Sequence, residues 1–153
     1  MKRWVVLYGM VWLVLVQIWL AYTPLAPPVP LYLHVVLGAG LVLLAYNNFV
    51  ALRESTVLGR IKRTARATFA LCLLMAVLGV ALYVHLGASW SIVGGITVEG
   101  GLRFLHFVNA MAIFSQVSAT AVVYDVWEEK EFATSTAPGE IPPPPAPPGS
   151  VPG

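Results

Sequence analysis

Two histidines, His34 and His106, each lie near the start of a long apolar stretch, and each is followed four residues later by a small residue, Gly38 and Ala110. An ionisable side chain inside hydrocarbon is costly and usually has a function. Imidazole nitrogen is a frequent axial ligand of haem iron, and two facing imidazoles are the donor set of a six-coordinate haem. The pair predicts a haem b, or a related haem, bound between His34 and His106.

The stretches that carry these histidines belong to a membrane protein. The chain has 153 residues, of which 58% are hydrophobic and 10% are charged, whereas soluble domains contain about 25% charged residues. Crossing the hydrocarbon core takes roughly 20 apolar residues. Short connections favour antiparallel neighbours, so we predict an all-α protein in which residues 1–132 form an up-down four-helix transmembrane bundle. The four predicted spans are 4–22, 31–52, 68–86 and 102–124.

The distribution of Lys and Arg predicts the orientation of the bundle. Cytoplasmic loops collect positive charge, and eight of the nine basic residues lie on the side of the two termini. We therefore expect a multi-pass protein of the plasma membrane with both termini cytoplasmic. The first span is longer than the apolar region of a secretory signal, so we expect it to be retained. The eight residues are Lys2, Arg3, Arg53, Arg60, Lys62, Arg63, Arg66 and Lys130.

The same topology places the two histidines at one depth. The second and fourth spans run in the same direction, from outside to inside, so His34 and His106 both lie in the outer part of the membrane. Residues three and four apart share a helix face, so Gly38 and Ala110 lie directly below the histidines and leave room for a flat macrocycle. Arg103, one turn before His106, suits a haem propionate, because a guanidinium matches a carboxylate.

Structural alternatives exist for each of these residues. A histidine near a span end can bond to headgroups or to a carbonyl group, and small residues are common where membrane helices pack closely. Arg103 is equally well placed to pair with Glu99 or to extend toward the surface. His85 is interpreted as an interfacial residue at the end of the third span. Gln17 is assigned to hydrogen bonding between helices.

The sequence lacks the motifs that several classes of function require. The sequence contains no phosphate-binding glycine loop, no His-Glu-x-x-His and no Cys-x-x-Cys-His, which argues against nucleotide hydrolysis, zinc proteolysis and covalent haem attachment. Cys72 is the only cysteine, and the four spans contain no acidic residue. The basic residues form a collar suited to anionic lipid and do not indicate nucleic-acid binding.

The pattern resembles one four-helix half of the haem A synthase family, in its compact archaeal-type form. The likeness rests on His34 to Gly38, the basic inner connection, Gly79, and Leu105-His106 with Ala110. In that family a glutamate stands three residues before the first histidine and an arginine directly after it; here these positions hold Leu31 and Val35. The resemblance implies haem ligation by His34 and His106, and a homodimer that rebuilds the two-half arrangement. Whether the chain is an oxidoreductase is left open, because Leu31 occupies the position of the catalytic glutamate.

Two functions from different classes follow. The first is a b-type haem protein with bis-histidine ligation near the outer membrane face, acting in electron transfer or in oxidase haem maturation, with a respiratory oxidase or another membrane complex as partner. The second is a cofactor-free tetraspan accessory subunit of a respiratory or transport complex. In either case the proline-rich segment 133–153 is predicted to be a disordered cytoplasmic tail, solvated or docked on a partner.

Overall fold

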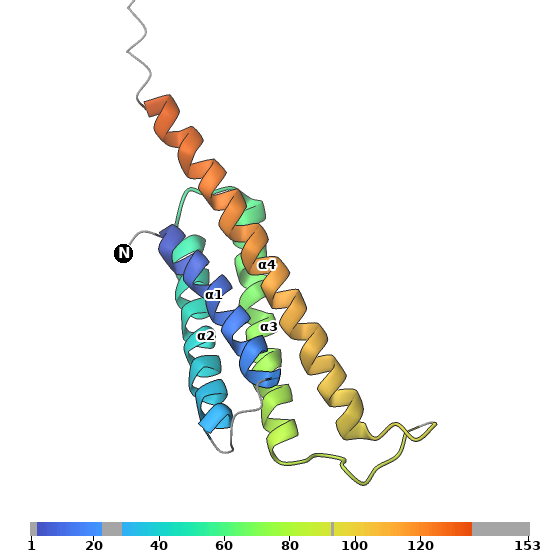
Figure 1. The fold of residues 1–153 in the computed structure, drawn as a ribbon. Coiled ribbons are helices and arrows are strands. Elements are labelled where there is room, and N and C mark those ends of the chain that lie inside the picture. Colours follow the sequence, from blue (N-terminus) through green and yellow to red (C-terminus); the bar gives the residue numbers. More distant parts are fainter. Residues whose placement is uncertain (1–2, 23–28, 93, 136–153) are drawn as a thin grey trace, which may run out of the picture.

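The computed structural model describes residues 3–22, 29–92 and 94–135, and these form four helices joined in an up-down arrangement (Figure 1). Within these ranges the only extended pairing is one isolated bridge between Ser91 and Thr97. The predicted all-α four-helix bundle is therefore confirmed. The helices are α1 (Arg3–Tyr22), α2 (Val29–Arg53), α3 (Gly59–Tyr83) and α4 (Val98–Ser135).

Each helix packs against two neighbours. Within the described residues, the helices that do not pack on each other, α1 with α3 and α2 with α4, lie across the two diagonals of the bundle. Contacts join α1 to α2, α2 to α3, α3 to α4, and α4 back to α1. In the described part of the chain, α2 and α4 make no comparable contact and face each other across the interior. This matters for function, because His34 lies on α2 and His106 on α4.

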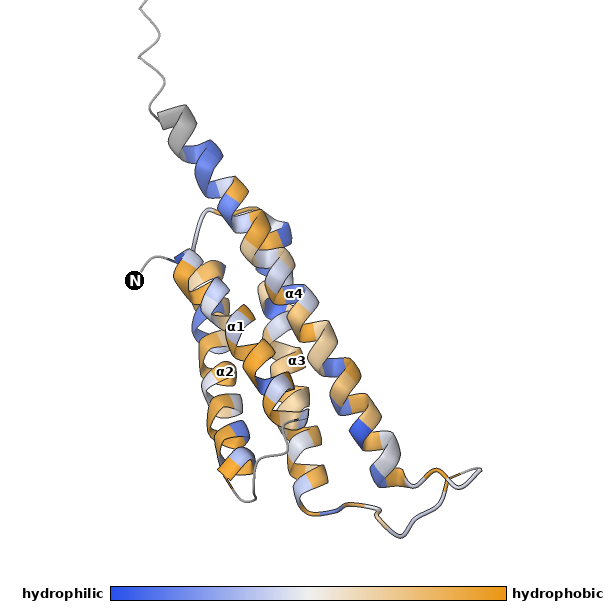
Figure 2. Ribbon diagram, in the orientation of Figure 1, coloured by the Kyte–Doolittle hydropathy of each residue, from blue (hydrophilic) through white to orange (hydrophobic). Residues whose placement is uncertain are grey.

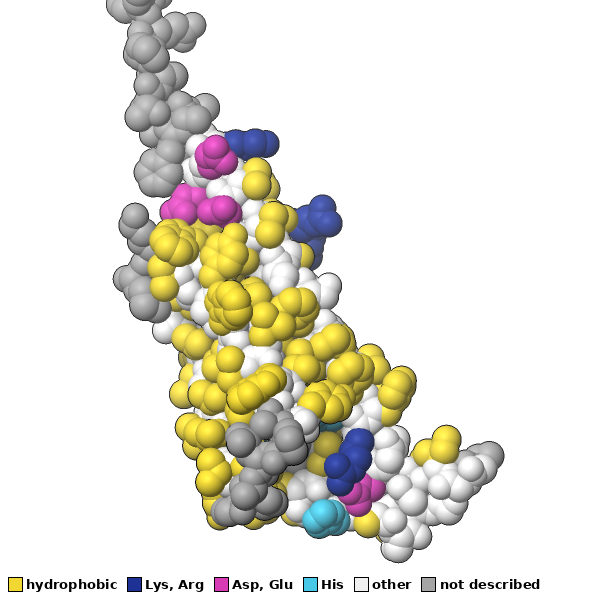
Figure 3. All heavy atoms as spheres, in the orientation of Figure 1, with side chains coloured by type: hydrophobic (Ala, Val, Ile, Leu, Met, Phe, Trp, Pro, Cys, Tyr) yellow, Lys and Arg dark blue, Asp and Glu magenta, His cyan; other side chains and the backbone are white. Residues whose placement is uncertain are grey.

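The outer surface of the bundle is apolar, as a lipid environment requires. All four helices are long and apolar enough to cross a membrane. Large side chains that point outward include Trp12, Leu43, Val77 and Phe104, each about two-thirds exposed. Figure 2 shows the hydrophobic colouring along the helices, and Figure 3 shows an apolar band on one face with charged side chains gathered toward the two ends. A soluble monomer rarely exposes such a surface, and the protein is an integral, multi-pass membrane protein.

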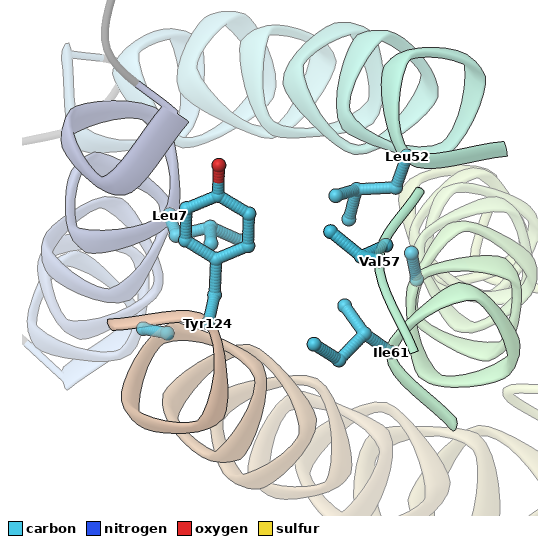
Figure 4. Close-up of a cluster of buried hydrophobic side chains, with 7 residues drawn as sticks. Leu7, Leu52, Val57, Ile61 and Tyr124 are labelled. Atoms are coloured by element: carbon cyan, nitrogen blue, oxygen red, sulfur yellow. The ribbon is translucent and has the colours of Figure 1, made fainter. Parts of the chain in front are cut away.

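Two clusters of buried side chains fill most of the interior. One lies at the end of the bundle near the α2–α3 connection, where Leu7, Leu52, Val57, Ile61 and Tyr124 converge from all four sides (Figure 4). The second occupies the middle of the bundle. It contains Met10, Val14, Leu41, Ala45, Cys72, Ile113 and Val117.

The helix ends differ from the predicted span ends. Helix α3 begins at Gly59, nine residues before the predicted span, so Arg60, Lys62, Arg63 and Arg66 lie on the helix and not in a loop. Hydropathy marks only the part of a helix inside hydrocarbon, and Lys and Arg are good helix formers that extend it into the headgroup region. Helix α4 likewise continues to Ser135. Its 38 residues span about 57 Å, more than a bilayer core needs.

His85 lies at the other end of α3, as expected for a residue at the end of the third span. The helix itself ends at Tyr83, and His85 follows it with a φ of 54°. The Leu86 N–H donates to the Ala81 carbonyl at 2.9 Å, and the His85 N–H donates to the Leu82 carbonyl at 3.1 Å. These two bonds form a Schellman motif, in which the left-handed position usually holds glycine. His85 therefore terminates the helix.

The proline-rich tail falls mainly outside the described residues. Residues 133–135 belong to α4, and residues 136–153 are not described. The predicted disordered tail therefore stays a prediction.

Replacing a buried leucine should cost far more stability than replacing an outward-facing one on the same helix. Leu52→Ala removes a fully buried side chain of α2, and we expect a loss of ~2 kcal/mol or more in the free energy of unfolding, because a cavity remains. Leu43, also on α2, is 68% exposed, so Leu43→Ala should cost well under half as much. Reversible unfolding in mixed micelles measures both values, and equal losses would contradict the assigned core.

Candidate functional site

A cavity of about 510 Å³ opens between all four helices on the histidine side of the mid-bundle cluster. Its floor is formed by Val14, Leu41, Cys72 and Ile113, which also belong to that cluster. The volume lies within the range of small-molecule and cofactor sites. All five residues singled out from the sequence line this cavity: His34, Gly38, Arg103, His106 and Ala110.

The two imidazole rings lie close together across the diagonal of the bundle. Their centroids lie 6.2 Å apart, with 41° between the ring planes. Imidazole nitrogen binds transition metals at about 2.0–2.1 Å, and a ring nitrogen lies roughly 1 Å from its ring centre, so two imidazoles on one metal have centroids about 6 Å apart. The separation between His34 and His106 matches that requirement.

Both rings also carry a nitrogen without a partner. The Nδ1 atoms of His34 and His106 are buried and make no hydrogen bond within the described residues. An unsatisfied buried polar atom costs about 1–3 kcal/mol.

Gln17 on α1 is a further cavity residue. Its Nε2 donates a hydrogen bond to the His34 carbonyl at 2.8 Å, while its Oε1 is buried without a partner. The bond ties α1 to the turn of α2 that carries His34. The predicted hydrogen bonding of Gln17 between helices is therefore confirmed, and its partner is the backbone of His34, which the residue pattern does not reveal.

His106 is held by contacts to α3. The Nδ2 of Asn109 donates to the Leu71 carbonyl at 2.9 Å, and this buried bond fixes α4 against α3 less than one turn from His106. A methyl group at Gly79 would lie 3.6 Å from Cε1 of His106. Gly79 therefore leaves open the space beside the ring that a longer side chain would fill.

A polar group lies at the mouth of the cavity. Arg103 donates to Glu99 Oε1 from Nε, at 3.1 Å, and also from its second guanidinium nitrogen. The alternative pairing of Arg103 with Glu99 is therefore confirmed, although Arg103 also lines the cavity. His85 Nδ1 lies 3.7 Å from the same carboxylate oxygen, and the His85 side chain is 71% exposed. His85 is not among the residues that line the cavity.

The donor set fits a haem better than a bare metal ion. In the described ranges, no three His, Cys, Asp or Glu side chains come together as a metal site. A porphyrin supplies four nitrogens itself, so that two axial imidazoles suffice. Comparisons with protein-family models, with curated proteins and with solved structures found no match.

The contact between Gly38 and Gln17 gives a test of the site's internal support. A methyl group at Gly38 would lie 3.1 Å from Gln17 Nε2, whereas one at Gly40 would meet nothing within 4 Å. Replacing either glycine by alanine should stabilise α2 by the same amount through the higher helix propensity of alanine. Gly38→Ala should therefore be less stable than Gly40→Ala by ~1 kcal/mol, because it displaces the amide from the His34 carbonyl. Unfolding free energies of the two variants measure this difference, and equal values would exclude it.

Proposed function

We propose that this protein is a membrane-bound b-type cytochrome that holds one haem between His34 and His106. The observation that carries the proposal is the pair of imidazoles 6.2 Å apart across the bundle diagonal. A further observation supports it: the cavity around the two rings is large and mainly apolar.

The residues of the chain have separate roles in this proposal. His34 and His106 would hold the iron, and Gly38, Gly79 and Ala110 keep the space beside and below the rings open. Arg103 would provide the cation for a propionate, and its guanidinium would then bond to the propionate and Glu99 together, or release Glu99. Haem, when bound, would supply a one-electron iron couple. Electron transfer, or delivery of haem in oxidase maturation, follows from this arrangement.

Position 31 favours a binding and electron-transfer role over oxidation of the haem. The resemblance to the haem A synthase family places a catalytic glutamate at this position, but the chain has Leu31, which is 47% exposed and is not among the cavity-lining residues. Glu99 is close to Arg103 at the mouth, but its carboxylate is engaged there. We therefore do not assign a proton-transfer group to the cavity.

The histidine end is proposed to face outward and both termini to face the cytoplasm. This follows from the basic residues at the opposite end, which are typical of the cytoplasmic side. A homodimer remains part of the proposal through the family resemblance, as does a respiratory oxidase or another membrane complex as redox partner.

The absorption spectrum tests haem binding directly. Protein purified from haem-replete cells should be red and give a reduced-minus-oxidised difference spectrum, with about one haem per chain. His34→Ala and His106→Ala should each abolish the low-spin bis-histidine spectrum, because one axial ligand is lost. His85→Gly is the matched control: it also removes an imidazole at this end of the bundle, but glycine suits the left-handed conformation, so the spectrum should persist.

Two results would overturn this assignment. Colourless folded protein would favour the cofactor-free accessory subunit. A spectrum that survives both cavity substitutions but disappears with His85→Gly would move the ligand out of the cavity.

A further inference from the structure

A second hollow, of about 330 Å³, lies between α3 and α4 toward the end of the bundle that carries the basic residues. It is separate from the histidine cavity and shares no lining residue with it. Its sides include Arg60 and Thr64 of α3 and Ser115, Gln116 and Thr120 of α4. We call this hollow the α3–α4 groove. A polar groove on a membrane helix pair calls for a partner, because lipid tails offer its side chains no hydrogen bonds.

Two hydroxyls of the groove already donate to carbonyl groups of their own helices. The Thr64 hydroxyl donates to the Arg60 carbonyl at 3.0 Å, and the Thr120 hydroxyl donates to the Gln116 carbonyl at 2.7 Å. In the part of the chain that the structure describes, the Arg60 guanidinium forms no ion pair, and the Gln116 amide and the Ser115 hydroxyl form no hydrogen bond. The Arg60 guanidinium can only donate, whereas the Gln116 amide and the Ser115 hydroxyl can each donate or accept, so the groove suits a ligand that offers acceptors to the guanidinium.

The electrostatics indicate that this ligand is an anion. No carboxylate lines the α3–α4 groove, and the first turn of α3 contains no acidic residue. Arg60, the basic residue that lines the groove, lies in the first turn of α3, next to the positive end of the helix dipole. Basic pockets between membrane helices bind lipid head groups.

The order of the donors along the groove distinguishes a phospholipid from a free phosphate. Arg60 lies at the start of α3, at the end of the bundle, whereas Gln116 lies one turn, or about 6 Å, closer to the bundle centre than Thr120. In a phospholipid the phosphate lies at the surface and the ester carbonyls lie just below it. A free phosphate has no ester carbonyl that could accept a hydrogen bond from the deeper Gln116 amide.

We propose that the α3–α4 groove binds one anionic phospholipid, with Arg60 on the phosphate and Gln116 donating to an ester carbonyl. The Ser115 hydroxyl is a second donor at the same depth. The groove is thus a lipid site built into the bundle, and it does not depend on the histidine cavity.

Native mass spectrometry of the full chain, released from detergent and titrated with phosphatidylglycerol, tests the proposal. The wild type should retain one lipid per chain, and phosphatidylcholine should bind about tenfold more weakly at the same concentration. Arg60→Gln should weaken phosphatidylglycerol binding about tenfold, because it removes a charge-assisted bond. Arg63→Gln is the matched control on the same helix: it removes the same charge but lies outside the groove, so the affinity should stay within about twofold.

Further measurements test how deep in the groove the ligand is bound and whether it is a lipid or a free phosphate. Gln116→Leu leaves the charge unchanged and should still weaken lipid binding about threefold, through the lost hydrogen bond. Inorganic phosphate and glycerol phosphate should bind far more weakly than the lipid. Equal losses of affinity in Arg60→Gln and Arg63→Gln would overturn the site in favour of nonspecific attraction by all the basic residues. An unchanged affinity in Gln116→Leu would overturn the contact with the ester carbonyl. Equal binding of glycerol phosphate and the lipid would overturn the lipid as ligand. Circular dichroism of each variant verifies that the helices are retained.

Discussion

The structure depends on one constraint: inside hydrocarbon no water is available to satisfy a polar group, so the chain must do so itself. Helices meet this requirement for the backbone, and Asn109, Thr68 and Thr120 meet it for side chains by bonding to carbonyls. Among the described residues, the buried side-chain atoms left without a partner are Oε1 of Gln17 and Nδ1 of His34 and His106. All three belong to residues that line the same cavity. The polar imbalance of the bundle interior is thus concentrated at one place.

The interior is divided into a packed half and a hollow half, and residue size explains the division. Around Leu52 and Ile61, large side chains meet from all four helices, including the aromatic ring of Tyr124. Near the histidines, small residues face the interior on three helices, namely Gly38 on α2, Gly79 on α3 and Ala110 on α4. Membrane helices gain no hydrophobic driving force from associating, so packing holds them together. A hollow of this size therefore removes packing contacts between the helices. The packed half must hold the four helices together in their place.

Hydropathy and residue spacing were enough to predict four spans, their antiparallel order and the common depth of His34 and His106, because each of these follows from length and direction alone. The distance between the rings was beyond prediction, since it depends on the rotation of α2 and α4 about their axes and on their diagonal arrangement. Gln17 was identified as a polar contact, but its bond to the His34 carbonyl joins residues that only folding brings together. The left-handed conformation of His85, normally that of glycine, was beyond prediction because the residue type gives no signal of it.

The diagonal position of the histidines has a consequence for the stability of the bundle. Helices α2 and α4 are held together only through α1 and α3, so a ligand bound by both His34 and His106 would join the two helices that do not pack on each other. A ligand that binds only the folded state stabilises it in proportion to its affinity and concentration. In the proposed cytochrome, His34 and His106 would therefore connect α2 and α4 through the bound haem. The hydrogen bonds of Gln17 to the His34 carbonyl and of Asn109 to the Leu71 carbonyl hold each histidine-bearing turn against a neighbouring helix, which reduces the ordering that binding must impose on the site.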